Sequence, residues 1–79
     1  MTDYRAVMLN VDSARELVRL ASRCDFDVDA ACSARPSYIV DAKSLLGVLG
    51  LDMRAPILIS GRGHNEELEQ FLRQHAVAA

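Results

Sequence analysis

The spacing of apolar residues predicts the first two elements of the chain. In residues 4–9 both faces of an extended segment are largely apolar, which predicts a strand at the centre of a sheet. The apolar spacing then changes to i, i+3, i+4, i+7, the stripe of an amphipathic helix that ends near Cys24. Ser13 and Glu16 fit an S-x-x-E capping box, so we expect Ser13 to begin that helix. The apolar stripe consists of Ala14, Leu17, Val18 and Ala21.

Two strands joined by a turn are predicted in the middle of the chain. Phe26, Val28 and Ala30 alternate with aspartates, which is the pattern of a half-buried strand with one acidic face. A turn around Pro36 follows, and residues 37–41 predict another strand. The aspartates would lie in a row along a strand, whereas calcium ligands need a turn with a central glycine, so no metal site is expected.

The second half of the chain predicts two capped helices with a strand between them. Ser44 is expected to cap a short helix that ends at Gly50, and Asn65 is expected to cap a longer final helix. Pro56 fits the first residue of the strand that continues through residues 57–60. The resulting order is β-α-β-β-α-β-α with all helices on one sheet face, an α+β open-faced sandwich in a single domain of 79 residues.

Composition narrows the range of functions. The nine basic residues are scattered and the net charge is −2, so no positively charged face for a nucleic acid is expected. No segment approaches the roughly 18 apolar residues of a membrane span, and the N-terminus lacks the pattern of a secretory signal. Cys24 and Cys32 have no metal-ligand spacing and are expected to be buried thiols of a reduced, cytoplasmic protein without a cofactor.

The helix predicted from Ser44 to Gly50 is the most informative segment for function. It is apolar nearly all round, and such a helix is either buried or available to a partner. Its serine suits a phosphate, because free backbone N–H groups and the helix dipole favour an anion there. From the residues alone, the favoured interpretation of the same serine is the cap of a core helix with no further role. The apolar residues are Leu45, Leu46, Val48 and Leu49.

Three segments together resemble the histidine-containing phosphocarrier protein (HPr) family of the bacterial sugar phosphotransferase system. DAKSLLGVLGL is similar to the family's regulatory serine segment, and ISGRG followed by NEELEQFL is similar to its last strand and helix. LVRLASRCDFDVD resembles the first helix and second strand of the family. The resemblance covers almost the whole chain and implies an HPr-like fold with a four-stranded antiparallel sheet.

The resemblance also implies that this chain has lost the phosphoryl-carrying histidine. The family carries a G-x-H-A-R-P segment at the first helix, and counting back along that helix places Asn10 at the histidine. Asp12 then stands at the arginine and Ser13 at the proline. An asparagine amide nitrogen is not nucleophilic, because its lone pair is delocalised into the carbonyl, and Asp12 would repel a phosphate that an arginine would bind. We therefore expect no catalytic residue and no enzymatic phosphate relay.

Ser44 matches the serine that a dedicated ATP-dependent kinase phosphorylates in Gram-positive members of the family. The resemblance implies carbon catabolite regulation, with the HPr-type kinase and a catabolite-control transcription factor as protein partners, as in the branch of catabolite repression HPr-like proteins. The residues expected to contact a partner are Lys43, Leu45, Leu46 and Leu49. The alternative is an interaction module that kept the fold and lost both switches, in which Ser44 is only a helix cap.

Overall fold

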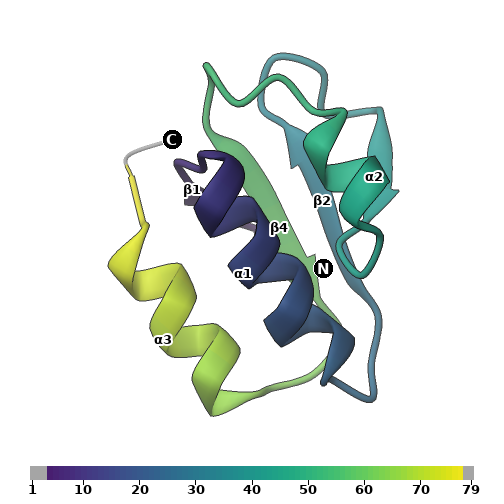
Figure 1. The fold of residues 1–79 in the computed structure, drawn as a ribbon, viewed down its shortest axis with the longest axis vertical. Coiled ribbons are helices and arrows are strands. Elements are labelled where there is room, and N and C mark those ends of the chain that lie inside the picture. Colours follow the sequence, from purple (N-terminus) through teal and green to yellow (C-terminus); the bar gives the residue numbers. More distant parts are fainter. Residues whose placement is uncertain (1–3, 78–79) are drawn as a thin grey trace.

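The computed structural model describes residues 4–77, which form a four-stranded antiparallel sheet and three helices (Figure 1). The observed order of elements is the predicted β-α-β-β-α-β-α, which confirms the α+β class. The strands are β1 (Arg5–Val7), β2 (Val28–Cys32), β3 (Ile39–Asp41) and β4 (Ile57–Gly61). The helices are α1 (Val11–Ser22), α2 (Leu45–Leu49) and α3 (Glu66–Gln74).

The strands lie in the order β1-β4-β2-β3, so β1 is at an edge of the sheet. The prediction that the first strand is central is therefore wrong. Its apolar residues on both faces do not indicate burial on both faces, because Tyr4 and Met8 are exposed while Val7 is buried. The outer side of β1 is partly covered by residues near the C-terminus: Ala76 forms a bridge with Val7 and the Val77 N–H donates to the Ala6 carbonyl at 3.0 Å.

All three helices cover one face of the sheet, and α1 lies between α2 and α3 (Figure 1). The core fills the space between this layer and the sheet. The largest fully buried side chains come from both layers, which explains why the helical stripe and the strand alternation share one interior. Each contributes about 1.5 to 3 kcal/mol through the apolar surface it removes from water. They are Val7, Leu17, Val28, Val48, Ile57 and Ile59.

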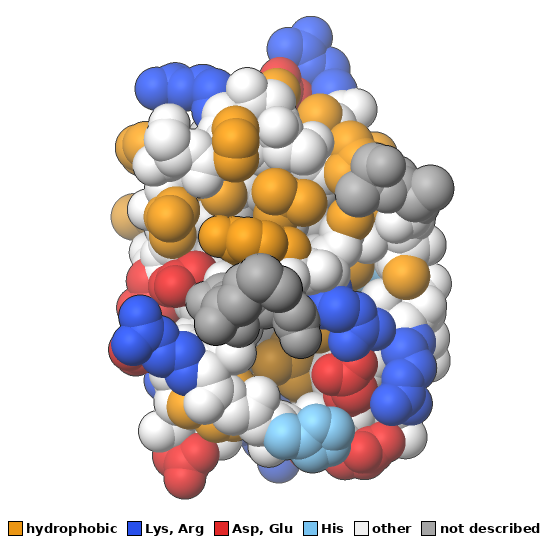
Figure 2. Space-filling model, turned by 180° about the vertical axis from the view of Figure 1, so that it is seen from behind, with side chains coloured by type: hydrophobic (Ala, Val, Ile, Leu, Met, Phe, Trp, Pro, Cys, Tyr) orange, Lys and Arg blue, Asp and Glu red, His pale blue; other side chains and the backbone are white. Residues whose placement is uncertain are grey.

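The opposite face of the sheet carries no helix, and apolar side chains gather in its upper half in Figure 2. The strand register explains this surface. Ala6, Leu58, Ala31 and Ile39 are successive cross-strand partners, so they form one apolar row across the sheet. Because side chains alternate along a strand, this row points away from the buried Val7, Ile57 and Ile59. The open face is therefore apolar along this row.

Some predicted boundaries shift in the structure. α1 begins at Val11 with Asn10 as its cap, so the prediction that Ser13 and Glu16 form the capping box is wrong. The second strand lies at Val28–Cys32 and not at residues 26–30, because the chain leaves α1 through a bend before it becomes extended. The predicted caps Ser44 and Asn65 are confirmed, as is the end of α2 at Gly50.

Cys24 and Cys32 are both free and buried, as the sequence predicts. Within residues 4–77, every helix is too short or too polar to traverse a bilayer. In the same range, no group of three His, Cys, Asp or Glu side chains is arranged to hold a metal ion.

Candidate functional site at the start of α2

Ser44 occupies the N-cap of α2 and lies at the surface. Its backbone is extended, with φ −99° and ψ 112°, and its Oγ accepts a hydrogen bond from the Gly47 N–H at 3.1 Å. The Ser44 N–H donates to the Asp41 carbonyl at 2.9 Å, which closes the turn between β3 and α2. Ser44 is thus fixed at an exposed helix start by two hydrogen bonds, one that its hydroxyl accepts and one that its backbone N–H donates.

Gly47 gives the Ser44 side chain the room that this cap needs. A Cβ atom on Gly47 would lie 3.3 Å from Ser44 Oγ and 3.3 Å from the Val40 Cβ, which is closer than most such contacts. The single gap in the apolar helix is therefore explained by the close approach of the cap and of β3. It also means that Gly47 has no side chain that could return a hydrogen bond to the Ser44 backbone.

The apolar residues of α2 divide into a buried and an exposed set. Val48 is fully buried and Leu49 is half-buried against the core. Leu46 is 85% exposed and Leu45 is 37% exposed. The helix is therefore partly a core element, while Leu46 and Leu45 present apolar surface to solvent next to Ser44.

Lys43 does not point freely into solvent from this turn. Its side chain is half-buried, and Nζ donates to the Cys24 carbonyl just beyond the end of α1 at 3.1 Å. Its backbone N–H donates to Asp41 Oδ1 at 2.9 Å. Sequence spacing gave no signal for the Lys43 contact, because its partner is a backbone carbonyl of a distant segment. Burial raises the pKa of the Cys24 thiol, although the Lys43 charge acts in the opposite direction.

Asn10, at the position expected for the family's histidine, has a defined structural role. Its Oδ1 accepts from the Ser13 N–H at 2.8 Å, and Ser13 Oγ accepts from the Asn10 N–H at 2.8 Å. These two bonds are a reciprocal capping box that opens α1. Lys43 contacts the other end of the same helix, which is about 18 Å long. Asn10 and Lys43, both singled out from the sequence, therefore lie at opposite ends of α1.

A groove of about 520 Å³ lies beside Asn10, between α1 and α3. Carboxylates of Asp12, Glu16 and Glu67 line it. Glu16 accepts from Arg19 Nε and Nη2, both at 2.8 Å, and this pairing lowers the pKa of the Glu16 carboxyl. An excess of negative charge beside the groove disfavours a phosphate ligand there.

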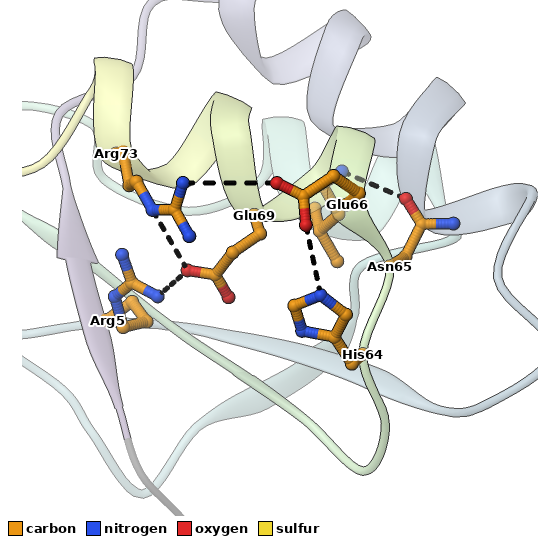
Figure 3. A network of polar contacts seen from close by, with 7 residues as sticks. Arg5, His64, Asn65, Glu66, Glu69 and Arg73 are labelled. Atoms are coloured by element: carbon orange, nitrogen blue, oxygen red, sulfur yellow. Dashed lines mark hydrogen bonds and ion pairs between the residues drawn. The ribbon is translucent and has the colours of Figure 1, made fainter.

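The two histidines lie in separate surroundings and do not contact each other. His64 Nε2 lies 3.2 Å from Glu66 Oε2 on the surface, and the His75 ring packs at 4.4 Å from the Phe71 ring. His64 is part of the polar network in Figure 3, which also joins Arg5 to Glu69. This pairing lowers the pKa of Glu69 and ties α3 to β1, so the network has a structural explanation.

The family comparisons identify no relative for this chain: no protein-family model matches it, and no curated protein matches it.

Proposed function

We propose that this chain is a non-catalytic HPr-like regulatory protein, which is phosphorylated on Ser44 and binds protein partners through α2. The observation that carries the proposal is the 85% exposure of Leu46 beside the exposed hydroxyl of Ser44. A large apolar side chain that projects from a short, anchored helix is suited to a pocket on another protein. Leu45 extends this surface, and Leu49 supports it from the half-buried side of the helix.

The HPr-like topology is part of the same proposal. The resemblance implies a four-stranded antiparallel sheet covered on one face by helices, and the observed sheet and helix layer agree with that description. The element order, read along the chain, supports the same assignment. In this proposal the protein acts in the cytoplasm in carbon catabolite regulation.

The proposal excludes a phosphate relay through the start of α1. The Asn10 amide is not a nucleophile, and its oxygen is already the acceptor of the Ser13 N–H. Asp12 in the first helical turn and Glu16 in the second add negative charge beside that position, where a phosphoryl group would need positive partners. Phosphoenolpyruvate-dependent transfer is therefore not expected.

Phosphorylation of Ser44 would follow the usual chemistry of a protein kinase. Ser44 Oγ attacks the γ-phosphorus of ATP, an Oγ–P bond forms, the bond from that phosphorus to the bridging oxygen breaks, and ADP leaves. The hydroxyl proton passes to a base of the kinase. The product adds about two negative charges at a helix start that has no acidic residue in its first turn, where a negative charge is favourable. A partner such as a catabolite-control transcription factor would then meet a charged edge beside Leu45 and Leu46.

The second candidate is an interaction module without a phosphorylation switch. The observation that favours it is that the Ser44 hydroxyl already accepts a hydrogen bond from the Gly47 N–H, so helix capping alone explains the serine. In this case α2 still binds a partner, but the modification state of Ser44 does not matter.

Mass spectrometry after two incubations separates these proposals. One sample contains an HPr kinase and ATP, and the other contains enzyme I and phosphoenolpyruvate. We expect one phosphate on Ser44 in the first and none in the second. Ser44→Ala should abolish the signal, whereas Ser13→Ala, which removes a serine from another helix start, should retain it. A phosphate from phosphoenolpyruvate would contradict the proposal, and none in either sample would favour the interaction module.

A further inference from the structure

We propose that Lys43 is a switchable tie between α2 and the end of α1, which a phosphate on Ser44 releases. In the unmodified protein the Lys43 ammonium holds the Cys24 carbonyl. In the phosphorylated protein it moves to the phosphate, and the segment after α1 loosens. This inference rests on the proposed function only in assigning Ser44 as the residue that is modified.

The first step is the contact at the end of α1. The last turn is closed by backbone bonds, from the Arg23 N–H to the Leu20 carbonyl at 3.2 Å and from the Cys24 N–H to the Ala21 carbonyl at 3.0 Å. The next carbonyl, that of Cys24, accepts the Lys43 ammonium at 3.1 Å. A cation at a helix C-terminus is favourable, because the carbonyl groups and the helix dipole are negative there. Lys43 therefore fixes the chain as it leaves α1.

The second step is the position of Lys43 next to Ser44. Asp41 anchors both residues: its Oδ1 accepts from the Lys43 N–H and its carbonyl accepts from the Ser44 N–H, each at 2.9 Å. The Cα atoms of Lys43 and Ser44 are about 3.8 Å apart as chain neighbours. A phosphate on Ser44 is thus created beside the base of the lysine side chain, whose flexible stem carries a compact positive charge.

The third step is the competition for the ammonium. The present acceptor is an uncharged carbonyl, whereas a phosphate on Ser44 carries about two negative charges. Both acceptors receive a hydrogen bond from the charged ammonium, but only the phosphate adds the Coulomb attraction of opposite charges to it. The phosphate is therefore the preferred partner of Lys43, and the Cys24 carbonyl loses its donor.

The released segment leads to a second loop of the molecule. Phe26 covers Gly63 so closely that a Cβ atom there would lie 2.5 Å from the ring. Beside it, the Arg62 N–H donates to the Asp27 carbonyl at 3.2 Å. Residues 24–27 therefore connect the Lys43 contact to the loop between β4 and α3, and a change at Ser44 extends to that loop.

Nuclear magnetic resonance tests the tie directly in protein with phosphoserine installed at position 44 during synthesis, so that no kinase is needed. The Cys24 carbonyl chemical shift reports the loss of its donor, and Lys43→Met provides the reference for complete release. Arg54→Met is the matched control, since it removes a cation that pairs only with the neighbouring Asp52 in the described chain. We expect the phosphorylated protein to show the Lys43→Met shift, and its Cys24 amide to exchange about tenfold faster.

Two results would overturn the inference. The first is a Cys24 carbonyl shift in the phosphorylated protein that equals that of the unmodified protein and of Arg54→Met. The second is a Lys43→Met protein with an unchanged Cys24 shift, since the tie would then be absent in solution. Failure of a kinase to modify Ser44 affects only the proposed function, because the phosphoserine here is installed without one.

Discussion

The starts of α1 and α2 both have a polar cap and an exposed apolar residue in the first turn, but they differ in how the cap is closed and in their charge. At α1, Asn10 and Ser13 satisfy each other's backbone N–H groups through two side chains. At α2, the Ser44 hydroxyl accepts from the Gly47 N–H. Gly47 has no side chain that could accept a hydrogen bond from the Ser44 N–H in return. Asp12 adds negative charge to the first turn of α1, whereas α2 has no acidic residue there and has exposed leucines.

This difference shows that a polar cap alone does not indicate a functional site. The pair at α1 is closed on itself, so it is fully explained by helix stability. The cap at α2 lies beside two exposed leucines and no acidic residue, whereas the exposed Val11 beside the α1 cap is followed directly by Asp12. The residues around the cap, and not the cap itself, therefore distinguish the candidate site from a structural helix start.

The largest expected effect concerns the exposed side of α2. Under the proposed function, Leu46→Glu should weaken binding to a catabolite-control transcription factor by about thirtyfold or more, because it places a charge in the centre of the proposed apolar contact. The free energy of unfolding of the Leu46→Glu variant should differ from that of the unmodified protein by less than about 0.5 kcal/mol, since the Leu46 side chain is exposed. Calorimetric titration and urea unfolding measure the two quantities.

Ile39→Glu is the matched control for this prediction. Ile39 is a comparably large apolar residue, 56% exposed, but it lies on the open sheet face, which α2 does not cover. The control should bind like the unmodified protein. Equal losses in both variants would remove the distinction between α2 and other exposed apolar positions.

The next contrast compares the two caps by stability. Asn10→Ala removes one side of the reciprocal box and should lower the free energy of unfolding by about 1 to 2 kcal/mol. Ser44→Ala removes a single bond at a five-residue helix and should lower it by about 0.5 to 1 kcal/mol. Urea unfolding of both variants, with Asn65→Ala as a third cap, provides the comparison. A larger loss at Ser44 would indicate that its main role is structural.

The smallest effect is an acid dependence that comes from the Glu16–Arg19 pair on α1. Arg19 lowers the pKa of the Glu16 carboxyl below its ordinary value near 4.5. A lowered folded-state pKa stabilises the protein above the ordinary value, and this contribution is lost as pH falls through the lowered pKa. The stability difference between the unmodified protein and Arg19→Met should therefore shrink below about pH 4.5. Thermal unfolding from pH 6 to pH 3 would show a constant difference if the pair had no effect.

The sequence predicts the elements of this fold better than their exact ends. Apolar spacing identifies α1, but Asn10 and Ser13 are both good cap residues three positions apart, and only the backbone hydrogen bonds distinguish them. The position of β1 at an edge was missed because Tyr4 and Met8 are apolar without being buried. Local patterns do not specify which strands become neighbours.

The candidate site could be predicted from the sequence only where it depends on local residue types. Ser44 as a cap follows from the residue types around it, and the structure confirms this. The contact of Lys43 with the Cys24 carbonyl has no sequence signal, because any residue type carries a backbone carbonyl. The division of α2 into buried Val48 and exposed Leu46 likewise depends on how the helix lies on the core.

The position of β1 also has a consequence for how the chain folds. In the described sheet β1 pairs with β4 alone, and these strands lie about fifty residues apart in sequence. Closing so long a loop costs conformational entropy before any contact between the strands can offset it, and non-local pairing slows folding. During synthesis β1 cannot pair with β4 until β4 has left the ribosome. Although β1 is made before the other three strands of this sheet, it is therefore expected to be among the last to join it.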